Sequence, residues 1–237
     1  MSLVLPQDRC FVIAEAGTNH AADIPEARLP RALDYVDAAA YAGADAIKFQ
    51  WFSDDAANVA FPLPGDELRR PRWARSSMAL DQWYEVRNFA RAKGLVLLAS
   101  AFEYTTIKWI AALDLPATKV ASRAVAEFPY DGSPKPYLIS LGMSGPVSFI
   151  DNAIYLECES KYPSTLRWQG THPGFSDHSG TPWRAIDAIW RGCRIVEVHY
   201  HLDERDAGPD LAASLTLDEL KLVCAARDAF AELRRQA

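Results

Sequence analysis

The chain has 237 residues, 49% of them apolar, which is enough to bury one sizeable core, so we expect a single domain over residues 1–237. Its formal net charge is −6 and its pI is near 5.4. Because a net negative surface does not attract nucleic acid or an anionic membrane, we expect neither as a partner.

The four cysteines form no CxxC pair. The first residues lack the pattern of a signal peptide, and no apolar run nears the roughly 20 residues that span a bilayer. We therefore expect a soluble, cytoplasmic protein with reduced thiols.

Short apolar segments rich in β-forming residues recur along the chain, and stretches with helical spacing separate several of them. This alternation predicts a parallel sheet covered by helices, and eight strands predict an α/β fold of the closed (β/α)8 type, a TIM barrel. In chain order, the expected strands are Phe11–Gly17, Asp45–Gln50, Leu95–Ser100, Ala117–Ser122, Tyr137–Gly142, Ile154–Glu159, His172–His178 and Ile195–Tyr200. The expected helices are Pro25–Ala42, Ala79–Lys93, Tyr104–Leu113, Pro182–Arg191 and Leu217–Arg234.

Three connections depart from this alternation. Arg123–Pro136 holds three prolines and a glycine, and Met143–Ala153 is short, so the helices after the fourth and fifth strands should be short or missing. Ser53–Ser77 is long, rich in Pro, Arg and Asp, and without obvious periodicity. A connection of this length is expected to be a functional loop or a disordered one.

Polar side chains gather where the predicted strands end. In a TIM barrel the carboxyl ends of the strands form the rim on which the active site is built, so this distribution predicts one active-site mouth. The residues concerned are Glu15, Asn19, His20, Lys48, Gln50, Ser100, Lys119, Ser122, Ser140, Glu159, Ser176, Asp177, His178, Glu197 and His199.

Two histidines on this rim are candidate metal ligands. His178 and His199 end the seventh and eighth strands, which are neighbours in a closed barrel, so their imidazoles are placed to share one ion. Two imidazoles with an oxygen ligand suit Mn, Fe, Co or Zn. A pair of rim histidines that only form hydrogen bonds is the alternative. His20, His172 and His201 compete as ligands, although alternation turns His201 to the outer face of its strand.

Two lysines point to an anionic ligand. Lys48 and Lys119, on the second and fourth strands, would both bring ammonium groups over the mouth, and a buried lysine is costly without a partner. Either lysine alone could equally lie on the surface. No P-loop or dinucleotide fingerprint is present, so a phosphate would belong to a small substrate. Glu15 is a candidate acid, base or orienting carboxylate, or else the ion-pair partner of Lys48. Three serines would complete an oxyanion cradle: Ser122, Ser140 and Ser176.

Eight short motifs resemble those of one enzyme family over nearly the whole chain. They are AEAGTNH at 14–20, GADAIKFQ at 43–50, TKVAS at 118–122, LGM at 141–143, SKYP at 160–163, GFSDHS at 174–179, EVHYHLD at 197–203 and GPDLAASL at 208–215. In this order they resemble the N-acetylneuraminate (sialic acid) synthase family, with its legionaminate and pseudaminate relatives.

The resemblance implies a barrel that binds phosphoenolpyruvate and a divalent ion, usually manganese. It also implies that C3 of phosphoenolpyruvate is joined to the aldehyde of an N-acetylated amino sugar. By position, the metal ligands would be His178 and His199, and Glu15 would handle water or proton transfer. These three residues and the two lysines, Lys48 and Lys119, are the expected catalytic set. The group around phosphoenolpyruvate would be Lys48, Lys119, Ser122, Ser140, Ser160 and Ser176, and the acceptor sugar would face Gln50, Tyr162 and Asp210.

Two departures from the family concern the acceptor. The family usually has a glutamate shortly after the KxxS serine, but Arg123 and Ala124 follow Ser122 here, which removes a group expected to hold the sugar. The resemblance also covers the barrel only, without the small antifreeze-like domain that supplies an arginine to the acceptor across a dimer. We therefore expect an acceptor other than N-acetylmannosamine. Arginines of the long connection are candidates to compensate: Arg69, Arg70, Arg72 and Arg75.

Two other functions remain open at this stage. A metal-dependent aldolase or lyase on the same barrel would use pyruvate, and phosphate release would separate it from a synthase. A non-catalytic barrel that acts as a binding or scaffold subunit is suggested by the two weak helices. A homodimer and a monomer are both compatible with the sequence.

Overall fold

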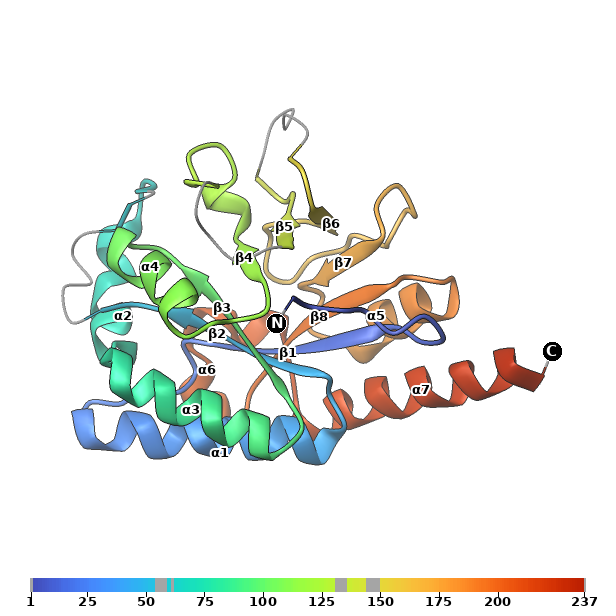
Figure 1. The fold of residues 1–237 in the computed structure, drawn as a ribbon, viewed down its shortest axis with the longest axis horizontal. Helices are drawn as coiled ribbons and strands as arrows, with labels where there is room; N and C mark the ends of the chain where they lie inside the picture. Colours follow the sequence, from blue (N-terminus) through green and yellow to red (C-terminus); the bar gives the residue numbers. More distant parts are fainter. Residues whose placement is uncertain (1, 54–58, 61, 131–135, 144–149, 237) are drawn as a thin grey trace.

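The computed structural model describes residues 2–53, 59–60, 62–130, 136–143 and 150–236. Eight parallel strands close into a barrel because β1 (Phe11–Gly17) pairs with β2 (Ala46–Trp51) on one side and with β8 (Ile195–Tyr200) on the other. The strands follow chain order around the barrel (Figure 1). Those between β2 and β8 are β3 (Val96–Ala101), β4 (Thr118–Val120), β5 (Tyr137–Ser140), β6 (Ala153–Cys158) and β7 (Gly174–Asp177). The predicted (β/α)8 barrel is confirmed.

The strands are buried on both faces, as expected for a parallel sheet covered outside by helices and filled inside by side chains. β1 and β8 have the predicted bounds, whereas β4 and β7 are shorter than predicted. β4 stops early because Ser122 already begins the 3-10 turn η3 (Ser122–Ala124). β7 starts late because Pro173 has no N–H to donate to a neighbouring strand.

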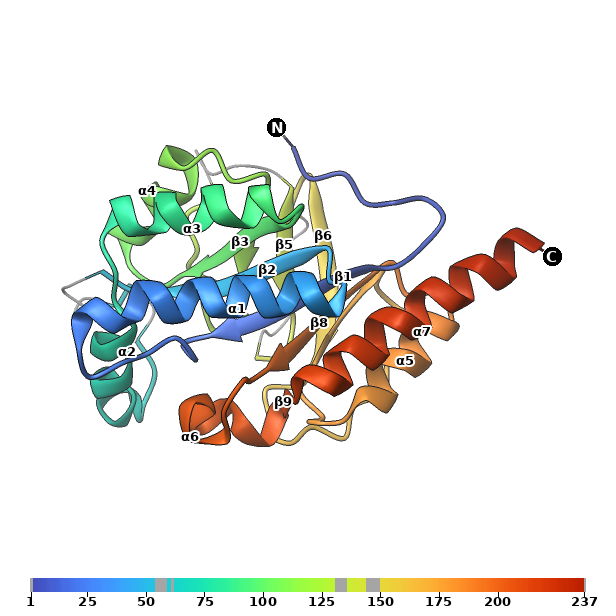
Figure 2. The ribbon, with the colours of Figure 1, turned by 90° about the horizontal axis from the view of Figure 1, so that it is seen from below.

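Helices cover most of the outer surface. They are α1 (Arg28–Ala42), α2 (Arg70–Ser76), α3 (Leu80–Ala92), α4 (Tyr104–Ala112), α5 (Pro182–Trp190), α6 (Glu204–Ala207) and α7 (Leu217–Gln236). In Figure 2, α1 lies between α3 and α7, and α5 packs beside α7. The buried face of α1 includes Ala32, Tyr35, Val36 and Ala39, which recur at the helical spacing of three and four residues. The predicted helix Pro25–Ala42 forms as the 3-10 turn η1 (Pro25–Ala27) followed by α1.

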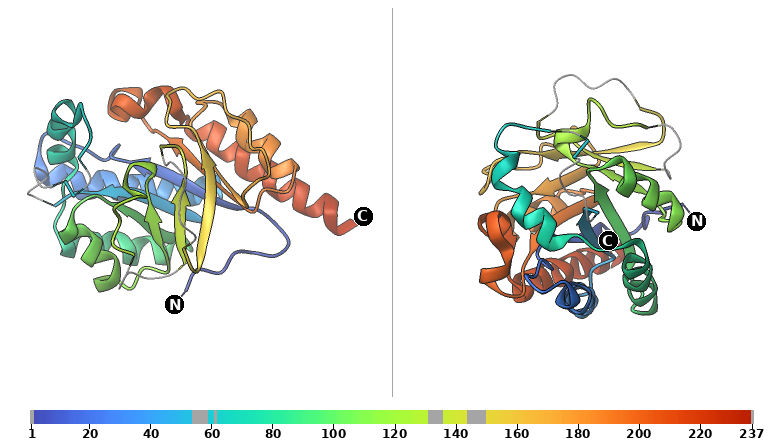
Figure 3. Two further views of the ribbon diagram at one scale, coloured as in Figure 1. Left: turned by 90° about the horizontal axis from the view of Figure 1, so that it is seen from above. Right: turned by 90° about the vertical axis from the view of Figure 1, so that its left-hand side faces the viewer.

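Among the described residues, no α-helix covers the barrel in the two connections where the sequence predicts weak helices. Between β4 and β5 the described residues hold only η3, and residues 131–135 lie outside the described part of the chain. Residues 144–149, between β5 and β6, also lie outside it. The first three residues of β6 are only half-buried. In Figure 3, left, the yellow β6 lies in front, and no described helix covers it.

The connection Ser53–Ser77 contains regular structure, so the expectation of an irregular loop is wrong for its second half. The 3-10 turn η2 (Asp66–Leu68) leads into α2, which has Pro71 in its first turn, where a missing N–H costs no hydrogen bond. Trp73 of α2 is buried and stacks on Phe52 with ring centroids 4.9 Å apart. This contact holds α2 at the side of the barrel that faces the viewer in Figure 3, right. Residues 54–58 and 61 lie outside the described chain.

The chain after β8 adds a short unit that the sequence did not predict. It consists of α6, the 3-10 helix η4 (Gly208–Ala213) and β9 (Ser214–Leu215), which pairs in parallel with the end of β8. Gly180, with a φ of +67°, lets η4 approach, because a Cβ there would lie 2.3 Å from the carbonyl oxygen of Ala212. This close packing brings Asp210 of η4 to the mouth of the barrel.

Among the described residues, no helix has the length and apolar character that crossing a membrane requires.

Candidate active site

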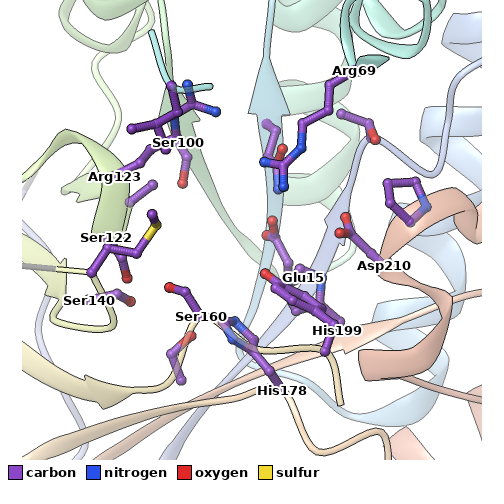
Figure 4. A pocket seen from close by; sticks show the side chains of 18 of the residues that line it. Glu15, Arg69, Ser100, Ser122, Arg123, Ser140, Ser160, His178, His199 and Asp210 are labelled. Carbon is purple, nitrogen blue, oxygen red and sulfur yellow. The ribbon is translucent and has the colours of Figure 1, made fainter. Parts of the chain in front are cut away.

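A cavity of about 820 Å³ opens at the carboxyl ends of the barrel strands. Each of the eight strands contributes at least one side chain to its lining, so the polar residues at the strand ends meet in one place. In strand order these side chains include Glu15, Lys48, Ser100, Lys119, Ser140, Cys158, Ser176 and His199. Figure 4 shows how several of them face the same space.

All twelve residues to which the family resemblance assigns a role line this cavity, whereas four other residues of the predicted rim do not: Asn19, His20, Glu159 and Asp177. The twelve are Glu15, Lys48, Gln50, Lys119, Ser122, Ser140, Ser160, Tyr162, Ser176, His178, His199 and Asp210. The competing histidines do not line it. His20 is buried between Phe49 and Trp83, with Nε2 2.8 Å from the carbonyl oxygen of Ser76, so it cannot share an ion with the rim histidines.

The floor of the cavity carries four buried charged groups. Lys48 Nζ lies 2.8 Å from Glu15 Oε2 and 3.6 Å from Glu197 Oε2, and Lys119 Nζ lies 3.6 Å from Glu197 Oε1. Serine hydroxyls form hydrogen bonds with three of these charged groups. Lys48 Nζ donates to Ser100 Oγ at 3.1 Å, Lys119 Nζ to Ser140 Oγ at 2.9 Å, and Ser176 Oγ to Glu197 Oε1 at 3.1 Å.

The pKa values of these groups are driven apart. Burial alone would raise the pKa of Glu197, but Lys119 and Lys48 outweigh it and lower that pKa to about 2. At Glu15 burial prevails over the attraction of Lys48, and the pKa rises to about 7. Burial also lowers the pKa of Lys119, whereas the pKa of Lys48 is raised because two carboxylates outweigh its burial. Near neutral pH the floor therefore has one fully ionised carboxylate for two lysines, which favours a bound anion.

The two rim histidines lie side by side. The ring centroids of His178 and His199 are 5.2 Å apart, and Tyr162 stacks on His178 at 4.6 Å. His178 Nδ1 is 2.8 Å from the carbonyl oxygen of Glu159, which can only accept, so Nδ1 carries a hydrogen. Burial would lower the pKa of His178, but the thiol of Cys158, 3.7 Å from Nδ1, raises it to about 9.

His199 fits a divalent ion as it stands, whereas His178, whose pKa of about 9 keeps it charged near neutral pH, would release its Nε2 proton on binding the same ion. Burial, together with the charges of His178 and Lys48, lowers the pKa of His199 well below its ordinary value, so its ring is neutral and keeps a lone pair. Nδ1 of His199 is buried and has no hydrogen-bond partner among the described residues. The carbonyl that fixes His178 is the kind of contact that orients metal-binding imidazoles. The described chain holds no group of three or more His, Cys, Asp or Glu side chains that could bind a metal, so further ligands would be oxygens from outside the protein.

Comparison with known proteins identifies the family. Residues 35–236 match the model that describes the NeuB family. The chain belongs to the NeuB family. It is 28% identical to the N,N'-diacetyllegionaminic acid synthase of Legionella pneumophila, over 93% of this chain and 72% of that protein. It is also 28% identical to the N-acetylneuraminate-9-phosphate synthase of Mus musculus, over 89% of this chain and 67% of that protein.

A solved structure shares the NeuB-family fold. The N-acetylneuraminic acid synthetase from Leptospira borgpetersenii, in complex with citrate, matches with a TM-score of 0.77 over 98% of this chain and 90% of that one. The sequence identity is 20%, so this likeness shows the barrel fold alone. The family resemblance inferred from the motifs is confirmed by the family match.

The NeuB-family cavity of this chain has an upper wall that comes mainly from the connection between β2 and α3. Arg69, Arg72 and Trp73 line the cavity from this connection, and Arg123 joins them from η3. Both Arg123 nitrogens donate to the carboxylate of Asp66, one of them at 3.0 Å. The position next to Ala124, where the sequence lacks the expected glutamate, thus carries a cation.

Several lining residues were given no role from the sequence. Glu197 was named only as a residue of the predicted rim, although it precedes His199 by two residues on β8 and strand alternation places both on the inner face. Cys158 ends β6 in the same way. Arg69 and Arg72 could be named only as members of an unplaced connection, and the structure places these two in the cavity. Arg75 instead pairs with Asp23 at 2.7 Å.

Proposed function

We propose that this NeuB-family barrel is a synthase of the sialic acid type, which condenses phosphoenolpyruvate with an aldehyde sugar and releases phosphate. The observation that carries this proposal is the floor of the cavity, where two buried lysines and a row of serine hydroxyls lie beside a pair of imidazoles. The names of the curated relatives support it, because they are synthases of sialic-acid-type sugar acids. Those names differ in whether the product carries a phosphate.

The donor would occupy the floor. Lys48 and Lys119 would bind the phosphate and carboxylate of phosphoenolpyruvate, and binding an anion would raise the pKa of Lys119 back towards its ordinary value. Serine hydroxyls would donate to the remaining oxygens: Ser122, Ser140, Ser160 and Ser176. Fixed donors around an anion stabilise the charge that moves onto the phosphate as it leaves.

The acceptor would lie above the donor, against Gln50, Tyr162 and Asp210. C3 of phosphoenolpyruvate forms a bond to the aldehyde carbon, water adds at C2, and phosphate leaves, so one water is consumed. Glu15 takes the proton of that water, for which a pKa of about 7 is well suited. His178 and His199 would hold a divalent ion, for which Mn²⁺ is our first choice. Once bound, such an ion supplies positive charge that polarises the aldehyde oxygen.

Calorimetry on metal-stripped protein tests this proposal. Phosphoenolpyruvate is titrated with and without Mn²⁺ into the native protein and into Lys119→Met, His178→Ala and His199→Ala. Lys108→Met, which removes an exposed lysine on α4, is the matched control. We expect Lys119→Met to weaken binding by about 100-fold, since it removes a buried charge-assisted contact, and Lys108→Met to leave it unchanged.

In both histidine variants, Mn²⁺ should no longer strengthen the binding of phosphoenolpyruvate. Phosphate release in the presence of aldehyde sugars then separates the synthase from an aldolase that uses pyruvate. Absence of phosphoenolpyruvate binding under every condition would refute the proposed function and favour a binding or scaffold role.

A further inference from the structure

The upper wall of the cavity carries a cation that the protein itself leaves available. Arg72 donates to the hydroxyl of Thr18 at 2.7 Å and to Asn19 Oδ1 at 3.0 Å, and Arg123 is paired with Asp66. The side chain of Arg69 is exposed and has no hydrogen bond or ion pair with any residue that the structure describes. Figure 4 shows its side chain extending into the cavity, between Arg123 and Asp210.

The charge of the cavity is opposite to that of the chain. Its lining carries five lysines and arginines against three aspartates and glutamates, whereas the whole chain has a net charge of −6. The two floor lysines are each within 3.6 Å of a carboxylate, so they are compensated in part. Positive charge therefore lies at the upper wall, on Arg69, Arg72 and Arg123, as well as on the floor.

Arg69 is held in place before any ligand arrives. Its backbone N–H donates to the carbonyl oxygen of Asp66 at 2.9 Å, and the Asp66 carboxylate accepts from Leu63 N at 2.9 Å as well as from Arg123. The turn that carries Arg69 is thus tied to η3, which follows β4. A guanidinium on a fixed backbone loses less freedom on binding an anion than one on a free loop.

The groups below Arg69 suit the neutral part of a sugar. Around Gly17, a Cβ would lie 3.4 Å from Asp210 Oδ2 and 3.5 Å from Gln50 Nε2, so these two side chains converge on one spot beside Glu15. An acceptor oriented with its aldehyde towards the floor would place its hydroxyls there and its far end beneath Arg69.

We propose that the acceptor sugar carries a phosphate or carboxylate at the end away from its aldehyde, and that Arg69 binds this group. The inference rests on the proposed function, since it assigns the floor to phosphoenolpyruvate. A guanidinium can form two parallel hydrogen bonds with either anion, which makes Arg69 a specificity-determining residue for the acceptor.

Matched sugars test the inference. Phosphate release from phosphoenolpyruvate is measured with N-acetylmannosamine, with its 6-phosphate and with the corresponding 6-uronic acid, and binding of each sugar is measured by calorimetry. Arg69→Met is compared with Arg69→Lys and with Arg70→Met, the exposed neighbouring arginine that does not line the cavity.

We expect the KM and Kd of an anionic sugar to be at least about ten-fold lower than those of the neutral sugar. Arg69→Met should abolish that difference, Arg69→Lys should restore part of it, and Arg70→Met should keep it. The two anionic sugars decide between phosphate and carboxylate as the recognised group.

Three results would overturn the inference while leaving the proposed function standing: equal or better use of the neutral sugar, an Arg69→Met effect of the same size on all three sugars, or phosphoenolpyruvate binding with no response to any anionic sugar. Failure to bind phosphoenolpyruvate at all would overturn both.

Discussion

The ion pair between Asp66 and Arg123 joins two segments of the upper wall of the cavity, and a double-mutant cycle measures its strength. The two side chains are 7% and 8% exposed, so neither charge is well solvated. Arg123 also lies over the rings of Trp73 and Phe102, at 5.7 and 5.9 Å from their centroids. Breaking a fully buried pair by removing one partner costs about 3–5 kcal/mol, because the other charge is left uncompensated.

The pair borders an open cavity, so the lower end of that range applies. Arg123→Met keeps an apolar stem against the rings and should lower the free energy of unfolding by about 3 kcal/mol. Asp66→Ala also removes the acceptor of Leu63 N, which adds about 1 kcal/mol. Because the double variant leaves no unpaired charge, it should cost less than the sum of the two, with a coupling energy of about 2 kcal/mol.

Urea unfolding followed by tryptophan fluorescence gives these free energies, since Trp73 lies beside the pair. The exposed pair between Lys93 and Asp37, with side chains 39% and 60% exposed, is the control, and its coupling should stay below about 0.5 kcal/mol. A coupling of Asp66 and Arg123 no larger than that of the control would refute the view that this pair fixes the mouth.

Three further predictions concern buried charge and close packing. The folded protein holds a proton on Glu15 up to about pH 7, whereas the unfolded chain releases it near 4.5, so unfolding free energy should fall as pH rises between these values. Urea unfolding at about pH 5 and pH 8 should show a fall of up to about 3 kcal/mol in the native protein, and Glu15→Gln should remove it. Glu197→Gln should lower the unfolding free energy by about 3 kcal/mol, because two buried lysines lose their ionised partner; a loss below about 1 kcal/mol would contradict that. Gly180→Ala should cost clearly more in thermal unfolding than Gly65→Ala, since both have positive φ but only Gly180 faces a carbonyl oxygen, 2.3 Å from the added Cβ. Equal costs would show that η4 moves freely.

The barrel could be predicted because the residues of each strand by themselves indicate a strand. Most strands are buried on both faces, so a short apolar run marks the element, and Phe11–Gly17 and Ile195–Tyr200 form with the predicted bounds. The errors occur where the signal lies outside the segment. Nothing within Ala117–Ser122 shows that η3 begins at Ser122, and β9 forms at the end of β8 next to η4, which packs against Gly180.

The residues on the floor of the cavity could be predicted for the same reason. Lys48, Lys119 and His199 are strand residues, so parallel closure in chain order brings their side chains to one rim, and sequence order with alternation suffices to group them. No such rule places the side chains of the upper wall. Arg69 reaches the cavity because Asp66 pairs with Arg123, which is 57 residues further along the chain. That contact depends on two connections whose shapes are set only by tertiary packing.

This division between strands and connections also bears on how the two substrates of the proposed reaction would be recognised. A change in a strand residue such as Lys119 alters a buried charge network that also holds the barrel together, so the floor can vary little without loss of stability. The side chain of Arg69 is exposed, so replacing it should change the free energy of unfolding very little. The floor, which the proposed function assigns to the donor, is therefore tied to the fold, whereas the upper wall, which it assigns to the acceptor, is open to change. An acceptor charge read by Arg69 would be a property of this chain that barrel architecture alone does not determine.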